Sequence, residues 1–173
     1  MSEQADIAVL DAEAAKNALD ELADVLVDCV ASGASVNFML PFGRNDAAAF
    51  FEKVVPSVAR GDTVLFAARL AGHIVGTVQL GLDTPPNQVH RAEIKKLLVH
   101  RDARGRGIGA ALMARAEAEA KRHGRTLLVL DTASDDARRL YARGGWQCLG
   151  NIPDYAMWPG GGYCDTTIFW KRV

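Results

Sequence analysis

The chain has 173 residues, 49% hydrophobic and 24% charged, with a formal net charge of −1. This composition is typical of a globular domain with one apolar core, and the small net charge disfavours a nucleic-acid binder or a membrane-surface protein. We see no signal peptide and no run of about 18 apolar residues that would span a membrane. Three widely spaced cysteines predict reduced thiols in a cytoplasmic protein: Cys29, Cys148 and Cys164.

The first half of the chain predicts a strand, two helices and then a hairpin of two strands. Residues 5–10 suit a strand, and apolar residues at spacings of three and four predict a helix over 12–30 that ends near Gly33. A second helix is predicted over 45–59, with Pro56 as the point where it would kink. Two strands over 63–70 and 73–82 follow, and Ala71-Gly72 between them predicts a hairpin.

The second half of the chain predicts four strands and two helices. The continuous apolar run 126–131 predicts a strand that is buried on both faces. The other predicted elements are a strand over 89–99, a helix from Ile108 to His123 stopped by Gly124, a helix from Asp135 to Arg143, and strands around 146–152 and 166–170. This order implies a mixed α/β sheet with helices packed on it.

The stretch 104–109 (RGRGIG) lies where a strand gives way to a helix. The first N–H groups of a helix are unpaired and carry the positive end of its dipole, so small residues there let an anion approach them. Gly105, Gly107 and Gly109 remove Cβ atoms, and Arg104 and Arg106 add charge. The stretch therefore predicts a phosphate site, with a plain glycine turn and solvated arginines as the alternative.

Two common phosphate-binding motifs do not fit this stretch. A P-loop ends in Gly-Lys followed by Ser or Thr, and the chain contains no Gly-Lys pair. A dinucleotide fingerprint follows the first strand of a βαβ unit, whereas this stretch follows an antiparallel meander.

The stretch from Leu97 to Gly109 resembles the acetyl-CoA signature of the GNAT family of N-acetyltransferases. The core of that signature is an Arg or Gln, two residues, a Gly, one residue, and a Gly or Ala. Arg104, Gly107 and Gly109 stand at those positions. About 30 residues downstream, the chain also resembles a second motif of this family, at Ala137, Leu140, Tyr141, Gly145 and Trp146. The order of predicted elements is similar to that of the family fold as well.

The resemblance implies a mixed, mostly antiparallel central sheet flanked by helices, formed by residues 1–173 as a single N-acetyltransferase domain. It implies acetyl-CoA as cosubstrate, bound by Leu97, Leu98, Val99, Arg104, Gly105, Arg106, Gly107, Ile108, Gly109, Ser134 and Tyr141. Ser134 replaces the asparagine of many relatives, and it can still cap the next helix. Several stretches also resemble acetyltransferases of the tabtoxin-resistance type, which implies a small amine substrate and a detoxifying role.

Acetyl transfer to an amine needs a base, because an amine of pKa about 10 is protonated at neutral pH. Glu93 lies within the strand that leads into the glycine loop, and Asp131 ends a strand where open α/β sheets bind ligands. Either residue suits the role, and an ion pair or a helix cap is the structural alternative. The family register makes Tyr141 the general acid, and packing beside Leu140 is its alternative.

Two further features concern the strand over 89–99. The resemblance implies that a backbone N–H near Leu97 or Leu98 stabilises the charge that develops on the thioester oxygen. The adjacent Lys95 and Lys96 are expected to point to opposite faces of the sheet.

The predicted substrate-binding residues are Asn37, Phe38, His90, Asp154 and Tyr155. Aromatic residues in the loop between the first two predicted helices and in a late loop around Asp154 would wall a small closed pocket, although they would equally suit a core or a homodimer interface. The residues show no metal-ligand spacing, so no metal is predicted. The alternatives to a small-molecule acetyltransferase are a non-catalytic acyl-CoA sensor and a protein or peptide N-acetyltransferase.

Overall fold

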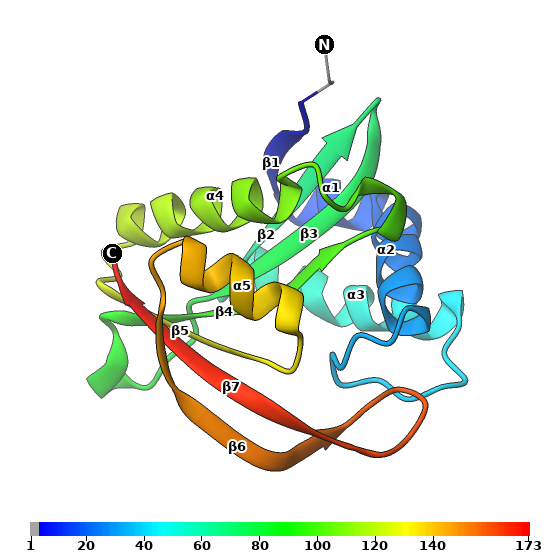
Figure 1. Cartoon of the computed structure of the whole chain (residues 1–173). Coiled ribbons are helices and arrows are strands. Elements are labelled where there is room, and N and C mark those ends of the chain that lie inside the picture. The colour runs from blue at the N-terminus through cyan, green and yellow to red at the C-terminus, as the bar shows by residue number, and fades with distance from the viewer. Residues whose placement is uncertain (1–3) are drawn as a thin grey trace.

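Seven strands form one sheet in the computed structural model, which describes residues 4–173 (Figure 1). The strands lie in the order β1-β2-β3-β4-β5-β7-β6. Their bounds are β1 Asp6–Leu10, β2 Thr63–Leu70, β3 His73–Gly81, β4 Arg91–Val99, β5 Leu127–Thr132, β6 Gln147–Met157 and β7 Tyr163–Arg172. Only β4 and β5 run parallel, and the other neighbours are antiparallel. The predicted mixed, mostly antiparallel sheet is confirmed.

Helices cover both faces of this sheet (Figure 1). One face packs against α1 (Ala12–Asn17), α2 (Leu19–Ala31) and α3 (Arg44–Ala59), and the other against α4 (Ile108–Arg122) and α5 (Asp135–Arg143). Short 3₁₀ turns span Pro86–Gln88 and Arg101–Ala103. The single helix predicted over 12–30 is in fact two, which meet at Ala18, and α3 continues through Pro56.

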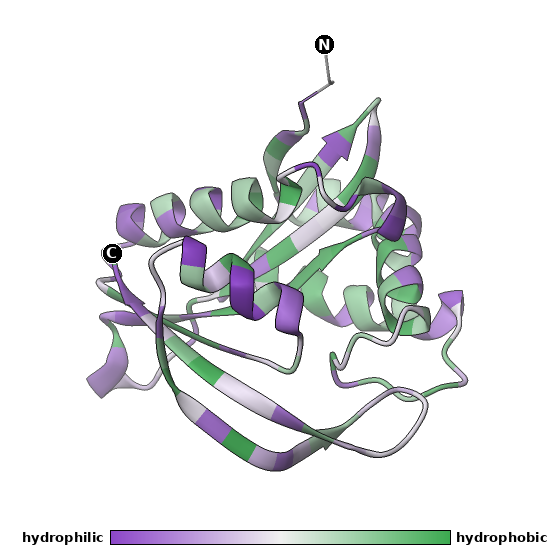
Figure 2. Cartoon of the chain, in the orientation of Figure 1, coloured by the Kyte–Doolittle hydropathy of each residue, from purple (hydrophilic) through white to green (hydrophobic). Residues whose placement is uncertain are grey.

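The hydrophobic core forms a layer on each side of the sheet (Figure 2). Side chains alternate along β2, so Leu65 packs under the α2–α3 layer and its neighbour Phe66 packs under α4. On β5, Leu128 and Leu130 are buried, but Val129 is only partly buried on the opposite face. The prediction that β5 is covered on both faces is therefore wrong, because Val129 lines a pocket there.

A β-bulge interrupts β4 and changes which way its side chains point. Thr77 of β3 pairs with Leu98, but Gln79 pairs with Lys95, so β4 contains one extra residue between these pairs. Lys96 lies in the bulge with φ of 53°. A bulge of this kind bends the strand and reverses the alternation of its side chains.

The two ends of β4 show this reversal. Ala92 and Ile94 pack in the α4 layer, whereas Leu98, also an even-numbered position, packs in the α2–α3 layer. The Lys96 ammonium lies 5.9 Å from the ring centre of Phe50 on α3, so Lys96 is on the α2–α3 side. Lys95 lies on this side too, and the expectation that the two lysines face opposite ways is wrong because of the bulge.

Strands β4 and β5 pair only over their first three residues. Arg91, Ala92 and Glu93 pair with residues 127–129, and the pairing ends there. Residues 94–99 of β4 therefore have no strand partner on the β5 side. Backbone groups that a parallel sheet would use remain available to a ligand along this stretch.

The β6–β7 hairpin forms a long arm at the sheet edge, and it extends past the helical layers (Figure 1). Every residue of β6 is exposed except Ala156, which is half-buried. Both strands are longer than predicted, and the segment around Asp154, expected as a loop, belongs to β6. The pairing with β7 is irregular between Ile152 and Ala156, and Asp154 has φ of 51°. None of the described helices combines the length and apolar character that a membrane crossing needs.

Candidate active site

The loop between β4 and α4 has the geometry of an anion site. Gly105 and Gly107 have φ of 75° and 77°, in the left-handed region that favours glycine. Gly107 is the N-cap of α4, and no side chain caps that end of the helix. A Cβ built at either glycine would meet no protein atom within 4 Å, so the space beside the loop is open. The residues therefore fit a phosphate group that accepts hydrogen bonds from the first N–H groups of α4.

Two other residues of the same motif make contacts inside the protein. A Cβ at Gly109 would lie 3.3 Å from Leu140 Cδ2, so this glycine allows α4 to pack closely on α5. Arg104 donates from Nε to the carbonyl oxygen of Val99 at 3.0 Å. Its guanidinium thus closes the loop onto the end of β4, and Arg106 is exposed beside the glycines.

The loop is tied to α2 through Asp28, a residue that the sequence reasoning missed. Arg101 donates from its backbone N–H to Asp28 Oδ2 at 2.8 Å, and its guanidinium pairs with Oδ1. Burial raises the pKa of Asp28, but two hydrogen bonds from Arg101 and the charges of His100 and Arg101 outweigh it, so the pKa is lowered. An acid within the apolar stretch VLVDCV was the available signal.

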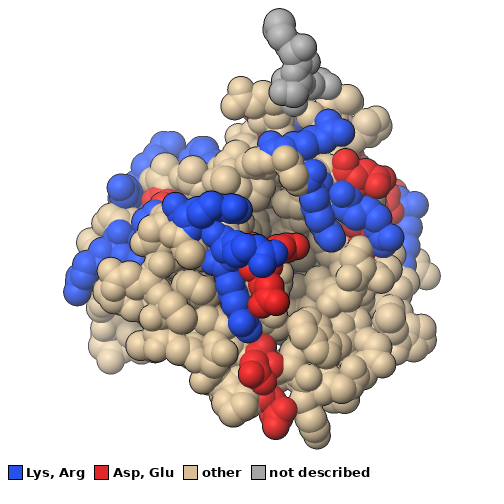
Figure 3. Space-filling view, viewed as in Figure 1, with Lys and Arg blue, Asp and Glu red and all other residues tan. Residues whose placement is uncertain are grey.

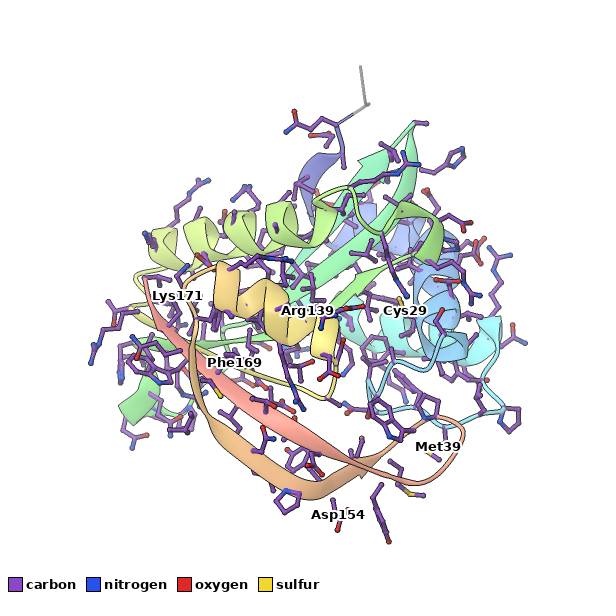
Figure 4. The ribbon with its side chains drawn as sticks, viewed as in Figure 1. Cys29, Met39, Arg139, Asp154, Phe169 and Lys171 are labelled. Carbon is purple, nitrogen blue, oxygen red and sulfur yellow. The ribbon has the colours of Figure 1, made fainter. Side chains whose placement is uncertain are left out.

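Basic side chains gather around a hollow in the molecular surface. Figure 3 shows Lys and Arg on both sides of a hollow at the centre of the view, with acidic side chains below. Arg139 on α5 lies near the centre of the same view (Figure 4). A positive rim of this kind favours an anionic ligand.

A pocket on the α2–α3 side of the sheet contains both predicted bases. It is lined by Glu93, Val129, Leu130, Asp131, Tyr155, Thr166 and Ile168. Thr166 donates from Oγ1 to Asp131 Oδ2 at 2.6 Å, which fixes that carboxylate. The structural alternatives to catalysis are a helix cap for Asp131 and an ion pair for Glu93. Neither is seen: Ser134 caps α5, and within residues 4–173 Glu93 forms no ion pair. The pocket adjoins the point where β4 and β5 separate, at Glu93.

Tyr141 is buried on the other side of the sheet, on α5. Its ring packs against Trp146 and Phe169, with centroid distances of 6.0 Å and 5.6 Å. Burial raises the pKa of Tyr141 well above its usual range, and the charge of Asp131 raises it further. The phenol therefore stays protonated at neutral pH.

The predicted substrate residues are not all brought together. Tyr155 lines the pocket, but its side chain is 56% exposed, so the pocket is open rather than closed. The Phe38 ring lies 4.6 Å from the Phe42 ring at a tilt and meets Phe50 of α3 edge to face at 5.4 Å, which places it in an aromatic cluster against α3.

The other three predicted substrate residues lie outside the pocket lining. Asn37 is exposed in the α2–α3 loop. His90 precedes β4 at the end remote from the glycine loop, and its carbonyl accepts a hydrogen bond from Thr126 N at 2.8 Å. Asp154 projects from the outer bend of β6 (Figure 4).

Comparison with known proteins identifies the class to which this arrangement belongs. Residues 34–146 match the model of the acetyltransferase (GNAT) family, so the chain belongs to that family. It is 32% identical over 105 residues to the IAA acetyltransferase of Azospirillum brasilense, a match that covers 60% of this chain and 67% of that protein.

Solved structures share the fold over nearly the whole chain. An N-acetyltransferase from Staphylococcus aureus Mu50 superposes with a TM-score of 0.80 and 20% identity, covering 97% of this chain and 98% of that one. A phosphinothricin acetyltransferase from Sinorhizobium meliloti, in complex with acetyl-CoA, gives a TM-score of 0.77 and 17% identity, covering 98% and 89%. The implied family is confirmed, and acetyl-CoA is the cosubstrate.

Proposed function

We propose that residues 1–173 act as one domain that transfers acetyl from acetyl-CoA to a primary amine of a small molecule. The amine attacks directly while both substrates are bound. The observation that carries this proposal is the pocket that joins Glu93 and Asp131, next to the stretch of β4 that has separated from β5.

The chain's own residues would hold the cosubstrate on the α4 side. Acetyl-CoA, when bound, supplies a thioester carbonyl that an amine can attack. The N–H groups after Gly105 and Gly107 bind its phosphates, and Arg106 adds positive charge. The unpaired backbone of residues 94–99 binds its pantetheine arm as a neighbouring strand would. A backbone N–H near Leu97 or Leu98 stabilises the developing charge on the carbonyl oxygen, and one such donor is worth about 3 kcal/mol.

Asp131 and Glu93 take the proton that an ammonium substrate must lose before it can attack. Both residues are exposed, but the Thr166 hydroxyl orients Asp131, whereas within residues 4–173 no side-chain hydrogen bond holds Glu93. Proton acceptance by such a group, directly or through one water molecule, contributes roughly a hundredfold or more to the rate. We assign the first acceptance to Asp131 because its carboxylate is held in place.

Tyr141 returns a proton to the sulfur of the departing CoA. Its raised pKa keeps the phenol protonated across the pH range in which the carboxylates are charged. The cysteines do not suit a covalent acetyl-enzyme route, since Cys29 and Cys164 are buried and Cys148 lies on the outer strand β6. The substrate amine therefore attacks the thioester directly.

The biological part of the proposal is a detoxifying acetylation of a small toxin or antibiotic, as in acetyltransferases of the tabtoxin-resistance type. We also propose a cytoplasmic location for the protein, since all three cysteines are free thiols.

The test is release of free thiol from acetyl-CoA in the presence of a panel of small primary amines. We expect a subset of amines to release thiol and to gain an acetyl group by mass spectrometry. Asp131→Asn should lower kcat about a hundredfold while calorimetry shows unchanged acetyl-CoA affinity. Thr166→Val, which removes only the hydroxyl that orients Asp131, should have a smaller effect. Acetyl-CoA binding without turnover of any amine would support a non-catalytic sensor instead.

A further inference from the structure

A side-chain amine, that of Lys96, lies on the same side of the sheet as the pocket, although Lys96 is not among the residues that line it. The bulge in β4 turns Lys96 onto the α2–α3 side of the sheet, where Glu93 also lies. Lys96 comes immediately before Leu97 and Leu98, the positions proposed to bind the thioester oxygen. A side chain at this point of the separated strand is therefore next to the site of acetyl transfer.

The ammonium of Lys96 is not held by a partner. Among residues 4–173, no carboxylate forms an ion pair or a hydrogen bond with it, and Asp131 and Glu93 act on it only through their charge. The Lys96 Nζ atom lies over the Phe50 ring, 5.9 Å from the ring centre. A lysine held only by a cation–π contact can leave that position at small cost, because such a contact is worth about 0.5–2 kcal/mol.

The surroundings also favour the reactive form of this amine. Burial lowers the pKa of Lys96 and the adjacent Lys95 charge lowers it further, against opposing effects of Asp131 and Glu93. A larger share of Lys96 is thus neutral than of an exposed lysine, and a neutral amine is the nucleophile in acyl transfer. The two carboxylates that would deprotonate a substrate amine are the same ones that neighbour Lys96.

We propose that Lys96 is a self-acetylation site, modified by the acetyl-CoA bound to the same molecule when no amine substrate occupies the pocket. The proposal rests on the proposed function. Lys96 Nζ forms a bond to the acetyl carbonyl carbon, and the bond from that carbon to sulfur breaks. The proton lost from Nζ passes to a pocket carboxylate. The sulfur takes a proton from Tyr141, which regains one from solvent, and leaves as CoA thiol. The products are Nζ-acetyl-Lys96 and CoA.

Acetylation would remove the positive charge of Lys96 and add an acyl group beside Phe50. Both changes occur on the sheet face that carries the amine pocket, where the charges of Asp131 and Glu93 act on Lys96, so we expect the modified enzyme to be slower with amine substrates. An amine that occupies the pocket should protect Lys96, because the two amines compete for the same thioester.

The test uses the full chain, first treated with a lysine deacetylase, incubated with acetyl-CoA alone and followed by intact-protein and peptide mass spectrometry. We expect one acetyl group per chain on Lys96, with a rate constant that does not depend on protein concentration. Lys96→Arg should abolish this modification, whereas the matched variant Lys95→Arg should retain it. Urea-unfolded protein reports the background reaction of acetyl-CoA with exposed lysines such as Lys16 and Lys53.

Other outcomes overturn this inference or the proposed function separately. Acetylation spread over exposed lysines at equal rates, or unchanged in Lys96→Arg, would contradict the self-acetylation site. An enzyme that turns over amines but never modifies Lys96 would do the same and leave the proposed function intact. Acetylation of Lys96 without turnover of any small amine would support the site and contradict the small-molecule function. If calorimetry detects no binding of acetyl-CoA, both proposals fail.

Discussion

The glycine loop before α4 and the β6–β7 arm border the same site but differ in how firmly the protein holds them. The loop is fixed by Asp28 from α2, by the Arg104 bond to Val99 and by the close packing of Gly109 on Leu140. As a strand pair the arm bonds only to β5, and β6 is exposed along nearly its whole length. Its tip is held by hydrogen bonds to the α2–α3 loop, from Leu40 N to the Pro159 carbonyl and from Ser35 Oγ to the Met157 carbonyl. The contrast indicates a cosubstrate side fixed by contacts with α2 and α5 and a substrate side held by strand pairing and by its tip.

The largest expected effect on cosubstrate binding is on the fixed side, from Gly107→Val. A Cβ there meets no protein atom, so the folded state should lose only about 1–2 kcal/mol from the left-handed φ. The same Cβ fills the space proposed for a phosphate, and we expect acetyl-CoA affinity to fall roughly a hundredfold, or about 2.7 kcal/mol, by calorimetry.

Gly124→Val is the matched control for this change. Gly124 also has a left-handed φ, of 68°, and open space around it, but it follows α4 at the opposite end from the loop. It should lose similar stability and bind acetyl-CoA normally. Equal loss of affinity in both variants would remove the case for a phosphate site at Gly107.

Tyr141→Phe should lower kcat by about ten- to a thousandfold through loss of the proton donor, with acetyl-CoA affinity preserved. Because burial and the charge of Asp131 raise the pKa of Tyr141, the wild-type pH–rate profile should show no fall at alkaline pH from this residue. Wild-type turnover by Tyr141→Phe in stopped-flow assays would assign the phenol to packing against Trp146 and Phe169.

Asp28→Asn should cost about 1–3 kcal/mol in the free energy of unfolding, since it breaks the bonds to Arg101. The folded-state pKa of Asp28 is below its unfolded value of about 3.9, so its contribution is present above that pH. The contribution is lost as pH falls through the lower, folded-state pKa. Urea denaturation across this range should show a flatter acid dependence in the variant than in the wild type, and parallel curves would contradict the assignment.

The smallest effect should come from the arm. Ile152→Ser changes a side chain that is 40% exposed on β6, and we expect less than about 0.5 kcal/mol by thermal unfolding. Leu112→Ala, at a fully buried position on α4, should cost about 2–5 kcal/mol in the same measurement. A large loss for Ile152→Ser would show that the arm is packed against something in solution.

The sequence predicted the fold well because most strands and helices have clear periodicity and end signals, as Gly124 shows after α4. Local signals also gave Glu93 and Asp131, which the structure brings to one pocket. The bulge at Lys96 was missed, because it depends on how β4 pairs with β3 and leaves no local mark in KKLLV. The contact between Asp28 and Arg101 joins residues 73 positions apart, which a local pattern cannot indicate.

The arm was predicted poorly for a related physical reason. Residues 147–157 are almost all exposed, so burial imposes no strict alternation of apolar and polar residues. The late aromatic residues were therefore expected to close the pocket as a loop, although Tyr155 lies in a strand and leaves it open.

The most direct test of the account is thiol release from acetyl-CoA with an amine panel, measured for wild type, Asp131→Asn and Gly107→Val under identical conditions. The account predicts amine-dependent release by the wild type. It also predicts a kcat defect with normal acetyl-CoA binding in Asp131→Asn, and a binding defect in Gly107→Val. Normal turnover by both variants would contradict the assignment of the glycine loop to the cosubstrate and of the Glu93–Asp131 pocket to catalysis.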